Sequence, residues 1–437
     1  MRQQQYRMPS LMLMAILLLP GARGDPAAAL QARIDAAIVS GTNLVSVPAG
    51  EYYFGNRTLL VQDARDLAIM AEGPVTFWFT NTDGGVMLRR CVNVTLSGAS
   101  KLEPLRIDRS PPPFAQGTVT ALLPSAKGGG RMVFTLDADS PDPRAIRPAR
   151  TTNGPKPNAG VCRTWTKGSR PADGRNNSRG LPVAGLPKGD LGACFDLHTI
   201  EQIGPRNFTA PNKGASIGDQ FVFYVWKGFT YVIANSSRVI TQDVAIHASG
   251  DMAVSEMDGE GGHTYRRLKV LARNGRLVAG IADGLHTSDL DHGSIVEDCH
   301  LSGLLDDYFN VQTTMLLVLE VDGTTVTLVH PHTSDQAGDF GDDGKPVTDQ
   351  WYGTTEPLSR VRAGEELIFY DPVDFREMGR VKTMRAASLL SPAVNQSTQL
   401  NLRGQALYNA LAGAHHRGAY ASVHLPLVAA LLHSALD

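Results

Sequence analysis

The stretch ADGLHTSDLDHGSIVEDCHLSGLLDDYFNV, residues 282–311, indicates the fold more clearly than any other part of the chain. Within it, DGLHT at 283–287 aligns with DYFNV at 307–311, and GDMAV at 250–254 aligns with both. The runs DVAIHAS, RRLKVLA and SIVEDCHLS precede the three segments and also align. Recurring short strands and turns are typical of a solenoid whose adjacent coils lie about 4.8 Å apart. The pattern predicts an all-β protein, a right-handed parallel β-helix of the pectate-lyase-like kind.

The same pattern of short strand-like runs extends toward the N-terminus, where runs such as LVSVPAGEYYF are separated by Gly, Asp and Asn. It is interrupted by two long segments that contain isolated strands and hairpins. We therefore expect six regions along the chain: a signal peptide at 1–24, an N-terminal cap with a short helix and the first coils at 25–105, a barrel-like inserted β-domain at 106–225, coils that carry the site at 226–314, a second inserted β-domain at 315–385, and an atypical tail at 386–437 that adds little to the fold.

The N-terminus has the three parts of a secretory signal peptide. Arg2 and Arg7 are basic, Leu11–Leu19 is apolar, and small residues precede Asp25. We therefore expect a secreted, extracellular protein. Six N-x-S/T sequons fit that route, and they begin at Asn56, Asn93, Asn176, Asn207, Asn235 and Asn395. Of these, the expected glycosylation sites are Asn56, Asn93, Asn207 and Asn235.

Bulk composition narrows the classes of partner. The formal net charge is −2, and no basic stripe is present, so nucleic acid is not an expected partner. Beyond the N-terminus no apolar run is long enough to predict a membrane span. Neither CxxC pairs nor His-rich spacing occurs, so we expect no metal site and no cofactor.

The four cysteines stand in two kinds of context. Cys162 and Cys194 lie in one Gly- and Pro-rich region, where an oxidising compartment favours a disulfide between them. Cys91 and Cys299 lie in strand-like runs and are expected to be free in the core.

The aligned segments bring three carboxylates together. Asp283 falls opposite Asp307, with Asp306 beside it, so adjacent coils would hold all three in one groove. Because crowded carboxylates repel one another, one of them is expected to hold its proton. A protonated acid beside an ionised base is the pair that glycosidic cleavage requires. His286 and Asn310, also one coil apart, could donate to sugar hydroxyls. The structural alternative is that these aspartates only bond to turn backbone, as is common.

Residues 282–311 resemble the core of glycoside hydrolase family 110, the α-1,3-galactosidases, in the Asp-x-x-His phrase and in the EDC…DD..NV phrase one coil later. The resemblance spans about 40–385. It implies a parallel β-helix with β-barrel insertions that removes terminal α-1,3-linked galactose with inversion and without a metal. It implies Asp283 as the general acid and Asp306 or Asp307 as the residue that holds the water. Gln312, where the family usually has His, is expected to contact the sugar.

Two other functions fit the same pattern. The change at Gln312, and a tail where the family continues with further coils, favour a β-helix protein that binds carbohydrate without turnover. The retained aspartates oppose that reading. The third reading is another β-helix enzyme that degrades polysaccharide, such as a lyase. A lyase groove would be expected to carry Lys or Arg beside the carboxylates, whereas Arg266, Arg267 and Arg276 are near only in sequence.

Overall fold

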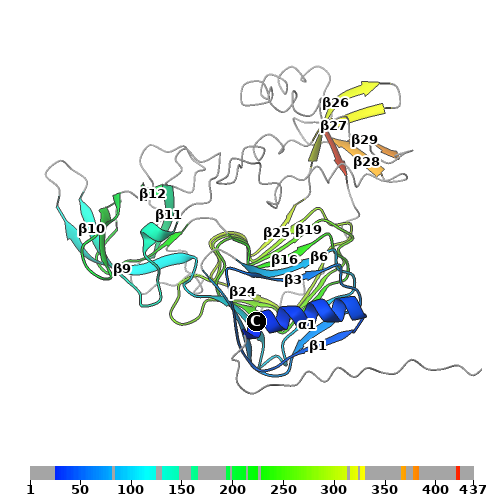
Figure 1. Ribbon diagram of the computed structural model, residues 1–437. Coiled ribbons are helices and arrows are strands. Elements are labelled where there is room, and N and C mark those ends of the chain that lie inside the picture. Colours follow the sequence, from blue (N-terminus) through cyan, green and yellow to red (C-terminus); the bar gives the residue numbers. More distant parts are fainter. Residues whose placement is uncertain are drawn as a thin grey trace, which may run out of the picture.

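Three parallel six-stranded sheets wind around one apolar interior in the computed structural model (Figure 1). This confirms the predicted parallel β-helix. The structure describes residues 25–80, 84–124, 130–146, 159–165, 193–196, 199–212, 215–224, 228–312, 315–322, 325–329, 366–370, 377–382 and 420–423.

Each coil passes through the sheets in the order I, II, III. Sheet I contains β1 (Leu44–Val47), β4 (Ala68–Ala71), β7 (Thr95–Ser97), β17 (Ile240–Gln242), β20 (Thr264–Arg266) and β23 (Ile295–Glu297). Sheet II contains β2 (Gly50–Gly55), β5 (Val75–Phe79), β8 (Leu105–Arg109), β18 (Val244–Ile246), β21 (Lys269–Val270) and β24 (His300–Leu301). Sheet III contains β3 (Thr58–Gln62), β6 (Gly85–Arg89), β16 (Tyr231–Ala234), β19 (Val254–Met257), β22 (Leu285–Ser288) and β25 (Phe309–Gln312).

The register of sheet III matches the alignment of the last two coils. Leu285 pairs with Phe309 and His286 pairs with Asn310, so Asp283 and Asp307 occupy equivalent positions 24 residues apart, as predicted. The predicted alignment of the preceding coil is wrong by two residues, because Val254 pairs with Leu285, 31 residues later, and not with Thr287. The extra length lies in the long turn 271–284 between β21 and β22.

A helix closes the first coil. Asp25 caps α1 (Pro26–Ser40) by accepting hydrogen bonds from the N–H groups of Ala27 and Ala28, and Gly41 ends it in the left-handed conformation. The predicted cap helix is thereby confirmed. Gln31 satisfies the open edge of sheet III, since its Oε1 accepts from Leu60 N at 2.9 Å and its Nε2 donates to Leu60 O at 2.8 Å. Paired in this way, the edge strand offers fewer free groups to another chain.

The first insertion leaves the solenoid after β8 and returns before β16. Its antiparallel sheet has the order β12-β11-β15-β9-β10-β14-β13, with β9 (Phe114–Leu123), β10 (Arg131–Leu136), β11 (Ala159–Trp165), β12 (Ala193–Asp196), β13 (Glu201–Gln202), β14 (Asn207–Pro211), β15 (Gln220–Tyr224) and the short 3-10 helix η1 (Pro143–Ala145). The expected boundary at 106 falls inside β8, which is a solenoid strand because Ile107 pairs with Phe77 and Ile246. In the described pairings β12 and β13 are the two edge strands of this sheet. They do not pair with each other, so these pairings form an open sheet and not a closed barrel.

The second insertion follows β25. Its five-stranded antiparallel sheet has the order β27-β26-β30-β28-β29, with β26 (Met315–Asp322), β27 (Thr325–Val329), β28 (Glu366–Tyr370), β29 (Glu377–Lys382) and β30 (Tyr420–Val423). The tail was expected to add little, but β30 pairs with both β26 and β28 in the centre of this sheet. The run YASV is too short for an alternating pattern to reveal it in an Ala-rich segment.

The interior of the solenoid includes one buried carboxylate. Glu256 follows Ile233 in the inward row of sheet III and is fully buried. Its oxygens accept hydrogen bonds from Tyr265 Oη at 2.7 Å, Thr287 Oγ1 at 2.5 Å and Ser294 Oγ at 2.8 Å. These donors from the neighbouring coils offset the cost of burying the group.

Replacing Tyr265 with Phe removes one of these donors. Because Glu256 stays buried with fewer partners, we expect the free energy of unfolding to fall by about 1–3 kcal/mol, measured by urea denaturation. Tyr53→Phe is the matched control, since the Tyr53 hydroxyl also donates to a glutamate, Glu51, but its side chain is 59% exposed. The control is expected to change stability by less than about 0.5 kcal/mol. Equal small changes in both variants would show that the interior network adds nothing to stability.

Candidate active site

The candidate site lies at the corner where each coil passes from sheet II to sheet III. Three successive turns, 247–253, 271–284 and 302–308, stack there, and isolated bridges join Ser249 to Gly280 and Gly280 to Leu304. Asp283 O accepts from Ala253 N at 2.8 Å, and Asp307 O accepts from Gly284 N at 2.9 Å. Backbone hydrogen bonds between coils therefore set the spacing of the side chains in this row.

Gly284 explains how closely two of these turns approach. A Cβ at this position would lie 2.7 Å from the carbonyl oxygen of Tyr308, which is closer than real contacts allow. The glycine directly after Asp283 thus lets the turn that carries Asp306 and Asp307 reach it.

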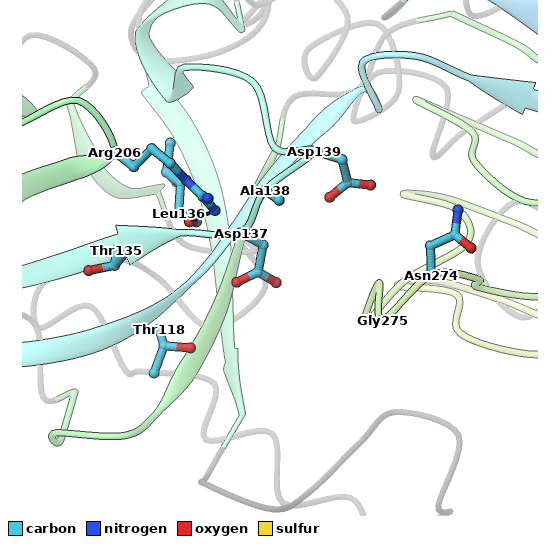
Figure 2. Close-up of a pocket in the computed structure, with 9 residues that line it drawn as sticks. All are labelled: Thr118, Thr135, Leu136, Asp137, Ala138, Asp139, Arg206, Asn274 and Gly275. Atoms are coloured by element: carbon cyan, nitrogen blue, oxygen red, sulfur yellow. Dashed lines mark hydrogen bonds between the residues drawn. The ribbon is translucent and has the colours of Figure 1, made fainter.

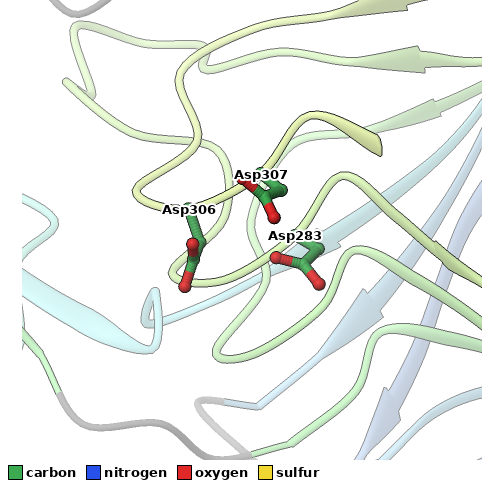
Figure 3. Close-up of side chains that lie close together, drawn as sticks. All are labelled: Asp283, Asp306 and Asp307. Atoms are coloured by element: carbon green, nitrogen blue, oxygen red, sulfur yellow. The ribbon is translucent and has the colours of Figure 1, made fainter. Parts of the chain in front are cut away.

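The three predicted aspartates do come together (Figure 3). One carboxylate oxygen from each of Asp283, Asp306 and Asp307 lies within 4.8 Å of the others. Asp283 is only 4% exposed, whereas Asp306 and Asp307 are exposed. The cluster therefore joins one buried carboxyl group to two that solvent and a ligand can reach. Oxygens at this spacing are also compatible with a cation, although exposed acidic groups commonly lie this close without one.

Two predicted neighbours orient Asp283. His286 Nδ1 lies 2.6 Å from Asp283 Oδ2, and Asn310 Nδ2 donates to the same oxygen at 3.1 Å. His286 is buried and Asn310 is half-buried, so both side chains are held by the surrounding coils. They position the carboxylate, and their contacts with a sugar stay a prediction. Gln312 ends β25 opposite Ser288, and its side chain lies outside the described residues.

A fourth carboxyl group, Asp251, belongs to the same row. It lies in the turn before β19, one coil ahead of Asp283, and its Oδ1 accepts a hydrogen bond from Met252 N at 3.0 Å. The pKa of Asp251 is raised to about 6, chiefly by burial. The Met252 N–H and His286 lower the pKa, and the charge of Asp283 raises it. The sequence contained this residue in GDMAV, which was aligned with DGLHT two residues out of register, and Asp251 was not singled out.

The first inserted sheet packs against this corner. Phe114 of β9 and Tyr224 of β15 are fully buried in one cluster with Ala248, Ile281 and Leu305, which come from the three stacked turns. The inserted sheet and the turns that carry the carboxylates therefore pack against each other through one apolar cluster.

Charged and polar contacts hold the same junction. Asp108, fully buried in β8, pairs with Arg276 at 2.7 Å and with Arg273 at 2.6 Å. Arg276 also reaches Asp139 of the insertion at 3.1 Å. Gln116 Oε1 accepts from Leu277 N at 2.6 Å. Because Asp108, Arg276 and Gln116 are buried and take part in these contacts, the long turn 271–284 that leads to Asp283 is fixed to both domains.

A separate recess lies on the same junction (Figure 2). It is a cavity of about 640 Å³ between the inserted sheet and the solenoid turn at Asn274 and Gly275. The other lining residues are Thr118, Thr135, Leu136, Asp137, Ala138, Asp139 and Arg206. None of the clustered aspartates lines it, so the recess and the carboxylate site are distinct.

The remaining predictions about covalent chemistry have mixed outcomes. Cys91 and Cys299 are free, as predicted, with Cys91 fully buried and Cys299 half-buried. Cys162 and Cys194 lie on the paired strands β11 and β12, and their side chains are outside the described residues, so their disulfide stays a prediction.

The glycosylation sites likewise stay predictions. The side chains of Asn56, Asn93 and Asn207 are exposed, and that of Asn235 is half-buried. Asn176, Asn395 and the signal peptide predicted at 1–24 lie outside the described residues. Across the part of the chain that the structure describes, no helix is long and apolar enough to cross a membrane.

Comparisons with known proteins give distant likenesses. No protein-family model matches the chain, and no curated protein matches it. Among solved structures, it is similar to the A-module of the Azotobacter vinelandii mannuronan C-5 epimerase AlgE4, with 11% identity and a TM-score of 0.18 over 66% of this chain and 73% of that chain. It is also similar to the Gp54 tailspike of Acinetobacter baumannii bacteriophage AP22, solved in complex with A. baumannii capsular saccharide, with 9% identity and a TM-score of 0.14 over 63% of this chain and 43% of that chain.

The raised pKa of Asp251 predicts a pH-dependent effect of replacing it. The folded protein favours the neutral carboxyl group, so it binds more protons than the unfolded chain between the unperturbed pKa of 3.8 and about 6. This contribution to stability is present at low pH and is lost as the pH rises through that window. Because Asn cannot ionise, the melting temperature of Asp251→Asn relative to wild type should rise between pH 4 and pH 7.

Asp298→Asn is the matched control for this measurement. Asp298 is exposed and has a positive φ of 52°, a conformation that Asn also tolerates. Its melting temperature relative to wild type is expected to stay nearly constant over the same pH range. A constant difference for Asp251→Asn as well would show that its carboxyl group is not penalised by burial.

Proposed function

We propose that this protein is a secreted glycoside hydrolase that removes terminal α-1,3-linked galactose from glycans with inversion. The observation that carries the assignment as a hydrolase is the cluster of Asp283, Asp306 and Asp307, in which one carboxylate oxygen of each lies within 4.8 Å of the others. Inversion is inferred from the resemblance alone, because inverting enzymes hold their two carboxyl groups roughly 6.5–9.5 Å apart. The resemblance of residues 282–311 to the α-1,3-galactosidases supports the choice of bond. The signal peptide predicted at 1–24 supports secretion.

The chemistry needs two protonation states in one cluster. One carboxyl group must donate a proton to the leaving glycosidic oxygen, and one carboxylate must accept a proton from the attacking water. The cluster offers three carboxyl groups for these two roles, one of them buried and two exposed. The cluster thus has the groups for acid and base catalysis within reach of one bond.

The three aspartates of the cluster differ in exposure and orientation, which suits them to different roles. Asp306 and Asp307 are exposed and can meet both water and substrate. Asp283 is buried and receives contacts from His286 and Asn310 on a single oxygen, Oδ2. Its Oδ1 has neither of those partners and can be directed at the reacting groups. Preorganised orientation of this kind lowers the cost of reaching the transition state.

Replacing each of the three aspartates by Asn tests this function. The change keeps the shape of the side chain and removes the titrating group, so kcat on an α-1,3-linked galactobiose should fall by about 10²- to 10⁴-fold. Substrate binding should change little. Asp298→Asn, an exposed aspartate outside the cluster, is the control and should keep wild-type turnover.

The product identifies the stereochemistry. An inverting enzyme releases β-galactose first from an α-galactoside, which NMR detects before mutarotation. Turnover unaffected by all three substitutions would place the active site elsewhere. Galactoside binding by a wild-type protein without turnover would favour the carbohydrate-binding alternative.

A further inference from the structure

The row of turns that carries the aspartates is closed at one end by the first insertion. The insertion occupies the turn from sheet II to sheet III in the coil before Asp251. Where it returns to the solenoid, Thr230 is fully buried and its Oγ1 donates to Ser249 Oγ at 2.9 Å. Ser249 Oγ in turn donates to Met252 O at 2.8 Å. The root of the insertion is thus bonded directly to the turn that holds Asp251.

Asp251 therefore stands between this root and the clustered aspartates. In sheet III Val254 pairs with Leu285, so Met252 stands opposite Asp283 and Asp251 lies one residue earlier. Its turn is about one strand spacing, near 4.8 Å, from that of Asp283 and about two spacings from that of Asp307. A sugar ring is about one such spacing across. If its anomeric carbon faces the cluster, the hydroxyls on the far side of the ring point either toward Asp251 or toward the later coils.

The closed side fits the end of a glycan, and the open side fits its continuation. A terminal residue has no further sugar beyond it, so its ring can face a wall such as the root of the insertion. The group on the other side of the scissile bond needs room, which the exposed Asp306 and Asp307 provide. Asp251 is then a polar side chain on the side of the row that would face the terminal ring.

The chemistry of Asp251 suits hydroxyl recognition. Met252 N–H occupies its Oδ1, which leaves Oδ2 for a ligand. The charged and titratable groups that act on it are Asp283 and His286. A half-buried carboxyl group gains more from a sugar hydroxyl than an exposed one, because water competes less for it. The site cluster supplies acid and base without Asp251, so this residue is free for binding.

We propose that Asp251 is a specificity-determining residue that binds a hydroxyl group of the non-reducing terminal galactose, beside the wall formed by the root of the first insertion. This inference rests on the proposed function, since it assumes hydrolysis of a terminal galactoside.

The experiment compares wild type and Asp251→Asn on nitrophenyl α-galactoside and on its 2-, 3-, 4- and 6-deoxy analogues. A hydrogen bond to a charged group corresponds to about 10- to 100-fold in kcat/KM. We expect Asp251→Asn to lose that much on the parent compound, and wild type to lose a similar factor on one deoxy analogue. On that analogue the two proteins should be equally active, because the shared contact is already gone.

Controls separate recognition from other roles. Asp251→Ser repeats the test with a side chain that cannot mimic the carboxyl group, and melting temperatures show that each variant folds. Asp298→Asn should match wild type on all five substrates. The loss in Asp251→Asn should also be the same for dinitrophenyl and methyl α-galactosides, because a binding contact does not depend on the leaving group.

Each other outcome overturns the inference in a recognisable way. If Asp251→Asn lowers kcat/KM by the same factor on the parent compound and on every deoxy analogue, Asp251 contacts no hydroxyl of the sugar. A loss confined to the methyl galactoside would make Asp251 the general acid instead. Wild-type activity retained by both Asp251 variants would overturn this inference alone. A folded wild type that is inactive on every galactoside would overturn the proposed function and this inference with it.

Discussion

Hydrogen-bond register between successive coils is the constraint on which the rest of this structure depends. The side chains at the corner from sheet II to sheet III have no long secondary structure of their own to hold them. Their positions follow from backbone bonds such as Ala253 N to Asp283 O and Gly284 N to Asp307 O. A slip of one residue in β22 would turn every side chain of that strand to the opposite face. It would therefore bury His286 in the interior and break its contact with Asp283.

The interior of the solenoid protects this register in two ways. Apolar residues such as Val86, Tyr231, Val254 and Leu285 stack in one inward row and are almost completely buried. Next to them, Glu256 accepts bonds only from donors placed at the correct coils. A buried group that is satisfied in one arrangement makes alternative registers costly, because they would leave it unpaired.

The first insertion is accommodated where the solenoid can lengthen a turn without disturbing its strands. It uses the same corner as the carboxylates, and buried pairs between Asp108 and two arginines fix it beside the long turn 271–284. The apolar cluster of Phe114 and Tyr224 with the stacked turns completes the junction. Loop-borne functional groups on a rigid repetitive scaffold are a common arrangement, since the scaffold supplies precision and the turns supply variety.

The sequence by itself determined the parallel solenoid, the cap helix, and the approach of Asp283 to Asp306 and Asp307, because local strand patterns and a 24-residue interval carry that information. It did not determine the place of Asp251, since a long turn changes the interval of the preceding coil to 31 residues. It also missed β30, four residues whose pairing partners lie far away in sequence. Only the tertiary structure showed that the first insertion leaves and re-enters the solenoid at the corner between sheets II and III, where the carboxylates lie. Contacts such as Asp108 with Arg276 join residues 168 positions apart, and no local pattern encodes which distant partner a buried charge will meet.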